Sequence, residues 1–138
     1  MKRLLIITAL FLYFFCSYSQ TIQKGAVLGI HHFTTLEIKQ GVTMEQFLEF
    51  CIDEYFPVYE KHFEGVTLSL MSGIKGKNEG ELGMIYCCKD EKTYNKYYDP
   101  AGGFSEEGLK AWKQVQPFFN ELLKLMNYKR EFTDWVIL

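Results

Sequence analysis

Apolar side chains along the chain follow two different spacings. Four runs rich in β-branched and aromatic residues predict strands, at 26–39, 66–72, 82–89 and 133–138. Apolar positions at steps of three and four predict two long amphipathic helices and one short one, at 43–63, 105–126 and 90–98. The chain therefore predicts an α+β domain in the order βαββαβ, with a four-stranded antiparallel sheet and two long helices on one face.

Capping and turn residues mark the ends of these elements. Thr43 is followed three residues later by Gln46, a capping-box pattern, and Ser105 begins the second long helix. Pro57 predicts a kink one turn earlier in the first helix, or a separate last turn, and Pro117 predicts a bend in the second. The glycine-rich, charged segment 73–80 predicts a hairpin loop.

Both faces of the predicted sheet are apolar. By parity, the even positions are expected to face the helices: Leu28, Ile30, Leu36, Leu68, Leu70, Leu82 and Met84. The odd positions, expected on the opposite face, still include Val27, Phe33, Met71 and Ile85. A sheet face in contact with water normally alternates with polar residues, so this face needs a cover. We expect a homodimer through the open sheet face, with two copies closing a dimeric α/β barrel.

The N-terminus has the pattern of a secretory signal peptide. Lys2 and Arg3 precede the apolar run 4–15, and Ser17 and Ser19 follow it, which predicts cleavage after Ser19. The apolar run is too short for a comfortable membrane span, which takes roughly 20 residues; an uncleaved anchor is the alternative. We expect a signal peptide at 1–19, a single domain at 20–138 with no membrane span after cleavage, and a periplasmic or secreted location.

Charge and cysteine content narrow the function classes. Removing Lys2 and Arg3 leaves the basic residues further outnumbered by the 17 Asp and Glu, and no basic run remains, which argues against nucleic-acid binding. Cys51, Cys87 and Cys88 match no disulfide scaffold. Buried free thiols are the favoured interpretation, with a Cys51–Cys88 bridge as the alternative. Neighbouring strand residues point to opposite faces, so no metal site is expected from these three.

His31 and His32 are candidates for site chemistry. As strand neighbours they point to opposite faces and cannot chelate one metal together. His32 shares parity with the positions expected beneath the helices, where it could act as a catalytic general base or donate to a ligand. A hydrogen-bonded core histidine is the alternative. His62 is expected to be a cation at a helix end.

Aromatic residues at helix and strand positions predict a cavity for a flat organic molecule. The candidate ligand-binding residues are His31, His32, Tyr55, Tyr59, Tyr86 and Trp112. Tyr97, Tyr98 and Trp135 could extend the cavity, and Asp134 and Glu54 could supply a carboxylate. Ordinary core packing is the alternative for the aromatic residues. No cofactor-binding motif is present, and the Lys75–Lys77 loop lacks the residues of a phosphate-binding loop.

Five segments together resemble one superfamily. They are Gly41-Val42, Tyr55-Phe56-Pro57, Phe63–Val66, Lys75–Gly80 and Thr133–Leu138. Their order and spacing resemble the dimeric α/β-barrel (ferredoxin-like) superfamily, in particular exported bacterial members of unknown function related to antibiotic-biosynthesis-type monooxygenases. The resemblance implies the fold and a dimer, and transfers no activity. Related barrels bind haem, for which His31 or His32 would be the ligand.

Three functions follow as hypotheses. The first is an exported homodimer that binds a small apolar or aromatic ligand. The second is a cofactor-independent monooxygenase-like or isomerase-like enzyme that uses His32 to remove a proton from an activated aromatic substrate. The third is a structural or interaction module whose interior is filled by its own side chains. The fold alone cannot choose among them.

Overall fold

The computed structural model describes residues 22–33, 37–128 and 132–138. The strands form one antiparallel sheet in the order β2-β3-β1-β4. They are β1 (Val27–Phe33), β2 (Val66–Ser72), β3 (Leu82–Cys88) and β4 (Phe132–Val136). The helices are α2 (Met44–Glu49), the π-helical segment η2 (Phe50–Tyr55), α3 (Phe56–His62), α4 (Glu91–Tyr97) and α5 (Glu106–Leu125). A four-stranded antiparallel sheet with helices fits a ferredoxin-like α+β fold, as the sequence predicts.

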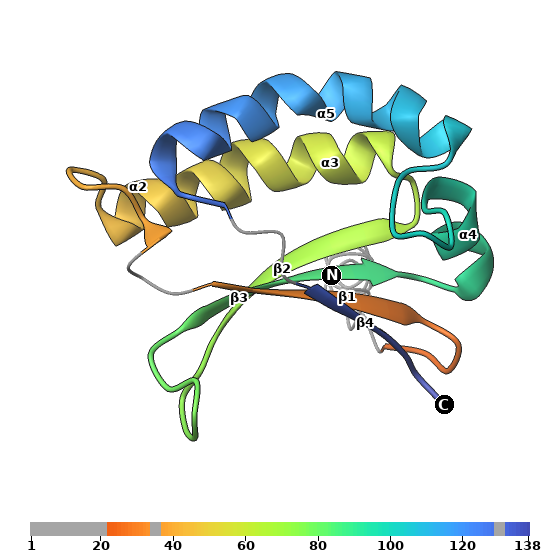
Figure 1. Cartoon of the computed structure of the whole chain (residues 1–138), viewed down its shortest axis with the longest axis horizontal. Helices are drawn as coiled ribbons and strands as arrows, with labels where there is room; N and C mark the ends of the chain where they lie inside the picture. Colours follow the sequence, from red (N-terminus) through yellow and green to blue (C-terminus); the bar gives the residue numbers. More distant parts are fainter. Residues whose placement is uncertain (1–21, 34–36, 129–131) are drawn as a thin grey trace, which may run out of the picture.

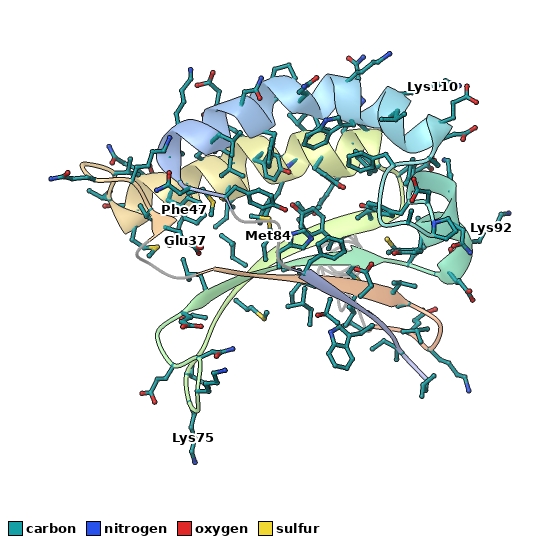
Figure 2. The ribbon with its side chains drawn as sticks, in the orientation of Figure 1. Glu37, Phe47, Lys75, Met84, Lys92 and Lys110 are labelled. Carbon is teal, nitrogen blue, oxygen red and sulfur yellow. The ribbon has the colours of Figure 1, made fainter. Side chains whose placement is uncertain are left out.

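The long helices form a single layer over one face of the sheet. The continuous run from α2 to α3 lies beside α5, while α4 lies at the end of the sheet away from α2 (Figure 1). None of the helices in the described part of the chain lies on the other sheet face (Figure 1). Phe47 and Met84 point into the space between the layers, whereas Lys75, Lys92 and Lys110 point away from it (Figure 2). The buried core therefore lies between the helices and the sheet.

A change of helical register interrupts the first helix near Pro57. Thr43 and Gln46 form the predicted capping box. Segment η2 then widens to π geometry, and the Phe56 N–H donates to the Cys51 carbonyl, five residues back. Pro57 has no N–H and cannot complete an α-helical bond to the Asp53 carbonyl. The predicted disturbance one turn before Pro57 is thus a π segment, a feature frequent at functional sites.

The two later helices begin where the sequence predicts. The Asp90 side chain accepts from the Thr93 N–H at 2.7 Å to cap α4, and the Ser105 hydroxyl accepts from the Gly108 N–H at 3.0 Å to cap α5. Helix α5 continues through Pro117. At Gly108 a Cβ would lie only 2.0 Å from the Tyr97 carbonyl oxygen, so the glycine lets α5 approach the end of α4 closely.

The parity prediction is correct for the central hairpin and wrong for β1. Leu68 and Met84 pack under the helices, and Met71 and Ile85 lie on the opposite face, as expected. In β1, however, Val27 belongs to the core, and register places Leu28 and Ile30 on the open face beside Cys87 and Ile85. Even-numbered residues of one strand need not face the same side of the sheet as even-numbered residues of another, because the length of each connecting segment differs. Leu36, and the side chain of Phe33, lie outside the described residues.

The remaining boundaries differ modestly from prediction. Strand β1 ends at Phe33 rather than near residue 39, and Ile38 makes an isolated bridge to Met126. The hairpin loop between β2 and β3 is present, closed by Gly73 and Gly80 with an N–H to carbonyl distance of 2.8 Å. The predicted signal peptide lies outside the described residues. Across the described part of the chain, no helix has both the length and the apolar character needed to cross a membrane.

Candidate functional site

A cavity of about 320 Å³ lies between the sheet and the helices. Its volume is at the lower end of the range typical of small-molecule sites, about 300–1,000 Å³. Its walls come from β1, β3, β4, η2, α3, α4, α5 and the α4–α5 loop. The lining residues are Gly29, His31, Tyr55, Tyr59, Tyr86, Cys88, Tyr94, Tyr98, Gly102, Gly103, Phe104, Trp112, Phe119, Tyr128, Phe132 and Asp134.

The sheet side of the cavity is built from one cross-strand row. Tyr86 of β3 pairs with Gly29 of β1, which pairs in turn with Asp134 of β4. Since Gly29 has no side chain, the Asp134 carboxylate can lie over this strand beside Tyr86 at the cavity. A Cβ on Gly29 would lie 2.9 Å from Asp134 Oδ1 and 3.7 Å from Tyr86 Cβ. Gly29 is therefore the residue that lets the carboxylate take this position.

His31 lies in the next row of the same face. Its Nδ1 is 3.0 Å from the Tyr128 hydroxyl, and its ring stacks on Phe132 with centroids 5.0 Å apart and tilts against Tyr86 at 4.6 Å. The sequence assigned His31 to the open face and His32 to the helix-covered face, and for His31 that assignment is wrong for the same reason as for Leu28. The side chain of His32, the predicted catalytic base, lies outside the described residues.

Two pairs of tyrosine hydroxyls span the cavity. Tyr59 and Tyr98 are 2.7 Å apart, a short hydrogen bond between α3 and the end of α4, while Tyr55 and Tyr86 are 3.5 Å apart. Burial is the main cause that raises the pKa of all four phenols above the ordinary 10.0. These hydroxyls are therefore neutral at physiological pH and can donate or accept a hydrogen bond.

The helix side of the cavity is a chain of aromatic contacts. Phe104 stacks on Trp112 at 5.3 Å, Trp112 meets Phe119 edge-on at 5.1 Å, and Phe119 meets Tyr128 edge-on at 5.3 Å. Successive ring contacts of this kind hold the wall in place and present flat apolar surface inward. The wall suits an aromatic guest.

The rim is shaped by Asp134 and by the loop after α4. The Tyr94 hydroxyl donates to Asp134 Oδ2 at 2.6 Å, and both burial and this bond to the carboxylate raise the pKa of Tyr94. Asp99 Oδ1 accepts from the Ala101 and Gly103 N–H groups at 2.8 and 2.9 Å, which holds the loop that carries Phe104. A shallow depression beside Asp99 adjoins the cavity through Gly102, Gly103 and Phe132.

Most of the predicted ligand-binding residues converge on this cavity. Those that line it are His31, Tyr55, Tyr59, Tyr86 and Trp112, joined by the further candidates Tyr98 and Asp134. Three other candidates lie elsewhere: Tyr97 is buried in the core, Trp135 lies on the open sheet face and Glu54 is exposed. His62 is in the last turn of α3, as predicted.

Several lining residues were not predicted. Gly29, Tyr94, Phe104, Phe119 and Tyr128 come from separate elements and carry no motif in the sequence. Only Gly29 gave a usable signal, since a glycine inside a strand often marks a close approach or a space.

The cysteines are unlinked thiols in the described structure. Cys51 and Cys88 are buried, Cys87 is half-buried, and only Cys88 reaches the cavity. Burial raises the pKa of Cys51 and of Cys88 to about 12, so neither is a reactive thiolate at neutral pH. Within residues 22–33, 37–128 and 132–138, no group of three His, Cys, Asp or Glu side chains is arranged to hold a metal ion.

No family model and no curated protein matches the chain. Among solved structures, the chain is similar to one described as a conserved protein from Methanosarcina mazei Go1. The sequences are 14% identical, the TM-score is 0.47, and the match covers 82% of this chain and 93% of the other.

Proposed function

We propose that this protein is an exported homodimer that binds a small, largely apolar aromatic ligand in the cavity beneath its helices. The observation that carries the proposal is the lining itself. Ten of the lining side chains are Tyr, Phe or Trp, and they surround about 320 Å³ of space that the protein leaves unfilled. An apolar pocket with a few convergent polar groups is the usual form of a small-molecule site. The open space weighs against a purely structural module.

The polar groups in the cavity favour binding over acid–base chemistry. The raised pKa of Tyr55, Tyr59, Tyr86 and Tyr98 keeps these phenols protonated, so they are poor bases. Neutral hydroxyls can instead satisfy one or two polar atoms on a ligand and fix its orientation. Specificity would come from these few hydrogen bonds, and affinity from the area of the rings.

His31 supports a second candidate, a cofactor-independent monooxygenase-like or isomerase-like enzyme. Its imidazole lies in the cavity wall, where Nδ1 is 3.0 Å from the Tyr128 hydroxyl, and an imidazole in this position could remove a proton from a bound aromatic substrate. In this alternative His31 takes the role that the sequence suggested for His32. Conversion of a bound ligand that stops in His31→Gln, with binding retained, would favour the enzyme over the binder.

The homodimer is proposed from the composition of the open sheet face. Leu28, Ile30 and Ile85 lie at the centre of that face, with Met71 and Trp135 toward its two edges. Trp135 is 56% exposed and Met71 is 37% exposed, so large apolar side chains are exposed at both edges of one sheet face. A second copy placed face to face would cover both.

Export is proposed from the N-terminal signal-peptide pattern alone. The relation to the dimeric α/β-barrel superfamily rests on the sequence resemblance. A periplasmic or secreted protein of this kind would carry, capture or sense a small molecule outside the cytoplasm.

Native mass spectrometry of the full chain, expressed with residues 1–19, tests export, dimer formation and ligand binding together. The expected species is a dimer that lacks residues 1–19 and carries an added small mass, which denaturing conditions release. A monomer would contradict the dimer, and a retained leader would contradict cleavage. A bare protein that also takes up no apolar fluorescent dye would contradict the ligand-binding proposal.

A further inference from the structure

We infer that the cavity takes an organic cation, namely an amine carried on an aromatic body, with its ammonium group beside Asp134. This inference rests on the proposed function and names the chemical class of the ligand. It follows from the charges at the rim, from the position of the Asp134 carboxylate and from the rings around it.

The carboxylates among the described residues at the cavity carry its acidic charge. Among the described lining residues, Asp134 is the one carboxylate, and none is Lys or Arg. Asp99 adds a second carboxylate in the depression that adjoins the rim. His31 is the one lining side chain that could carry a positive charge, and it lies one row further along the sheet, beside Phe132. A carboxylate ligand entering at this rim would meet like charge, whereas an ammonium group would meet opposite charge.

The Asp134 carboxylate keeps one oxygen available to a guest. Oδ2 accepts the Tyr94 hydroxyl at 2.6 Å, which fixes the orientation of the group. Oδ1 lies over Gly29, close enough that a Cβ there would be at 2.9 Å, and no hydrogen bond to it is made by any described residue. Gly29 and Asp134 both line the cavity, so a guest there can reach an oriented carboxylate oxygen. A charged donor makes the strongest bond to such an acceptor.

Aromatic faces near the carboxylate add a second attraction for a cation. Tyr94 and Tyr98 stack with centroids 5.1 Å apart, and the Tyr86 ring lies across Gly29 from Asp134. The faces of neutral aromatic rings are electron-rich and attract an ammonium group within about 6 Å. The ligand body would then extend inward from Asp134, against Trp112 and Phe119.

Three probes with the same carbon skeleton separate charge from ring packing. Tryptamine, tryptophol and indoleacetate end in an ammonium, a hydroxyl and a carboxylate group respectively. Binding of each to the mature protein is measured by calorimetry and by saturation-transfer NMR. We expect tryptamine to bind about tenfold more tightly than tryptophol, since hydrogen bonds to charged groups exceed neutral ones by roughly this factor, and indoleacetate to bind most weakly.

Two matched variants test the role of the carboxylate. Asp134→Asn keeps an oxygen that accepts from Tyr94 but removes the charge, and should abolish the preference for tryptamine over tryptophol. Asp53→Asn makes the same change at an exposed position on η2, outside the cavity, and should leave the preference intact.

The outcomes separate the inference of a cationic ligand from the proposed function, which is ligand binding in general. Equal binding of all three probes, or a preference for indoleacetate, would overturn the cation inference while ligand binding stands. A preference for tryptamine that survives in Asp134→Asn would also overturn it. Failure of every probe and of a neutral apolar dye to bind would overturn both.

Discussion

Gly29 lies opposite Asp134 across the β1–β4 pair, and the missing side chain lets Asp134 Oδ1 approach to 2.9 Å from the point where a Cβ would lie. Tyr86 lies on the other side of Gly29, across the β1–β3 pair. A central strand would ordinarily carry a β-branched residue at such a position, because strands favour them. The glycine weakens the strand slightly and lets the Asp134 carboxylate lie close to the strand at the proposed ligand site.

The first prediction is that Gly29→Ala reduces ligand binding more than it reduces stability. The added methyl would enter the cavity floor and displace Asp134, which lies 2.9 Å from the Cβ position. We expect at least a tenfold loss in affinity for tryptamine, equivalent to about 1.4 kcal/mol. Calorimetric titration gives the affinity, and urea denaturation gives the free energy of unfolding.

Gly83→Ala is the matched control for that substitution. Gly83 is in β3 with its α-carbon facing the open side of the sheet, and its new methyl would meet the flexible end of Met71 at 2.4 Å. Because Met71 is partly exposed, it can move aside. Equal affinity losses in the two alanine variants would contradict the role assigned to Gly29.

The element ends were predictable because their signals are local. The Thr43 capping box, the Asp90 and Ser105 caps and the glycine-rich hairpin each depend on residues within a few positions of one another. The effect of Pro57 was predictable in position, since a missing N–H must disturb the bond one turn earlier. The kind of disturbance was not predictable, because a kink and a π segment both accommodate the missing N–H of Pro57.

The face of β1 was not predictable from its own residues. Leu28 and Ile30 are its most apolar side chains, and the rule that apolar residues face the core assigns them to the helices. The structure does the reverse, with Gly29 and His31 beneath the helices. A cavity inverts the usual pattern, since its floor needs small and polar residues while the outer face keeps apolar ones.

Aromatic content nevertheless identified much of the candidate site. Tyr55, Tyr59, Tyr86 and Trp112 were selected from sequence and share one cavity. The additional wall residues Phe119 and Tyr128 could not be selected, because only the packing of α5 and the segment after it against the sheet brings them there. Tertiary contacts of this kind leave no signature in a single sequence.

The second prediction concerns the short bond between Tyr59 and Tyr98. Tyr59→Phe should lower the free energy of unfolding by about 1 to 2 kcal/mol, because it leaves the Tyr98 hydroxyl without its partner at 2.7 Å. Tyr55→Phe is the control, since its contact with Tyr86 is 3.5 Å long and should cost less than about 0.5 kcal/mol. Similar decreases in the free energy of unfolding of both variants would show that the Tyr59–Tyr98 hydrogen bond stabilises the fold no more than the Tyr55–Tyr86 contact does.

The third prediction is a loss of stability in alkali. Burial raises the pKa of Tyr59 and Tyr86 above 10.0 and that of Cys51 above 9.0, so the folded state holds these protons longer than the unfolded chain does. The folded state then binds more protons at high pH, and the free energy of unfolding must fall as pH rises above 9.0 and 10.0. At neutral pH, well below the ordinary thiol pKa of 9.0, these groups should contribute almost no pH dependence.

Tyrosinate absorbance and circular dichroism, followed together through an alkaline titration, check this coupling. We expect the buried phenols to ionise only as the fold is lost. Tyr86→Phe should reduce the alkaline loss, because it removes one of the groups that differ between the two states. Full ionisation at the ordinary phenol pKa in a folded protein would contradict the burial that the structure describes.

The last prediction addresses the open sheet face. A charge at position 135 would be buried if a second copy covers this face, and an unpaired buried charge is strongly unfavourable. Trp135→Asp should therefore convert the dimer to a monomer in sedimentation equilibrium. Ile74→Asp is the matched control: Ile74 is 91% exposed in the hairpin loop rather than on the sheet face, and its substitution should leave the dimer intact. If the unmodified protein sediments as a monomer, or Trp135→Asp remains a dimer, the partner does not lie on this face.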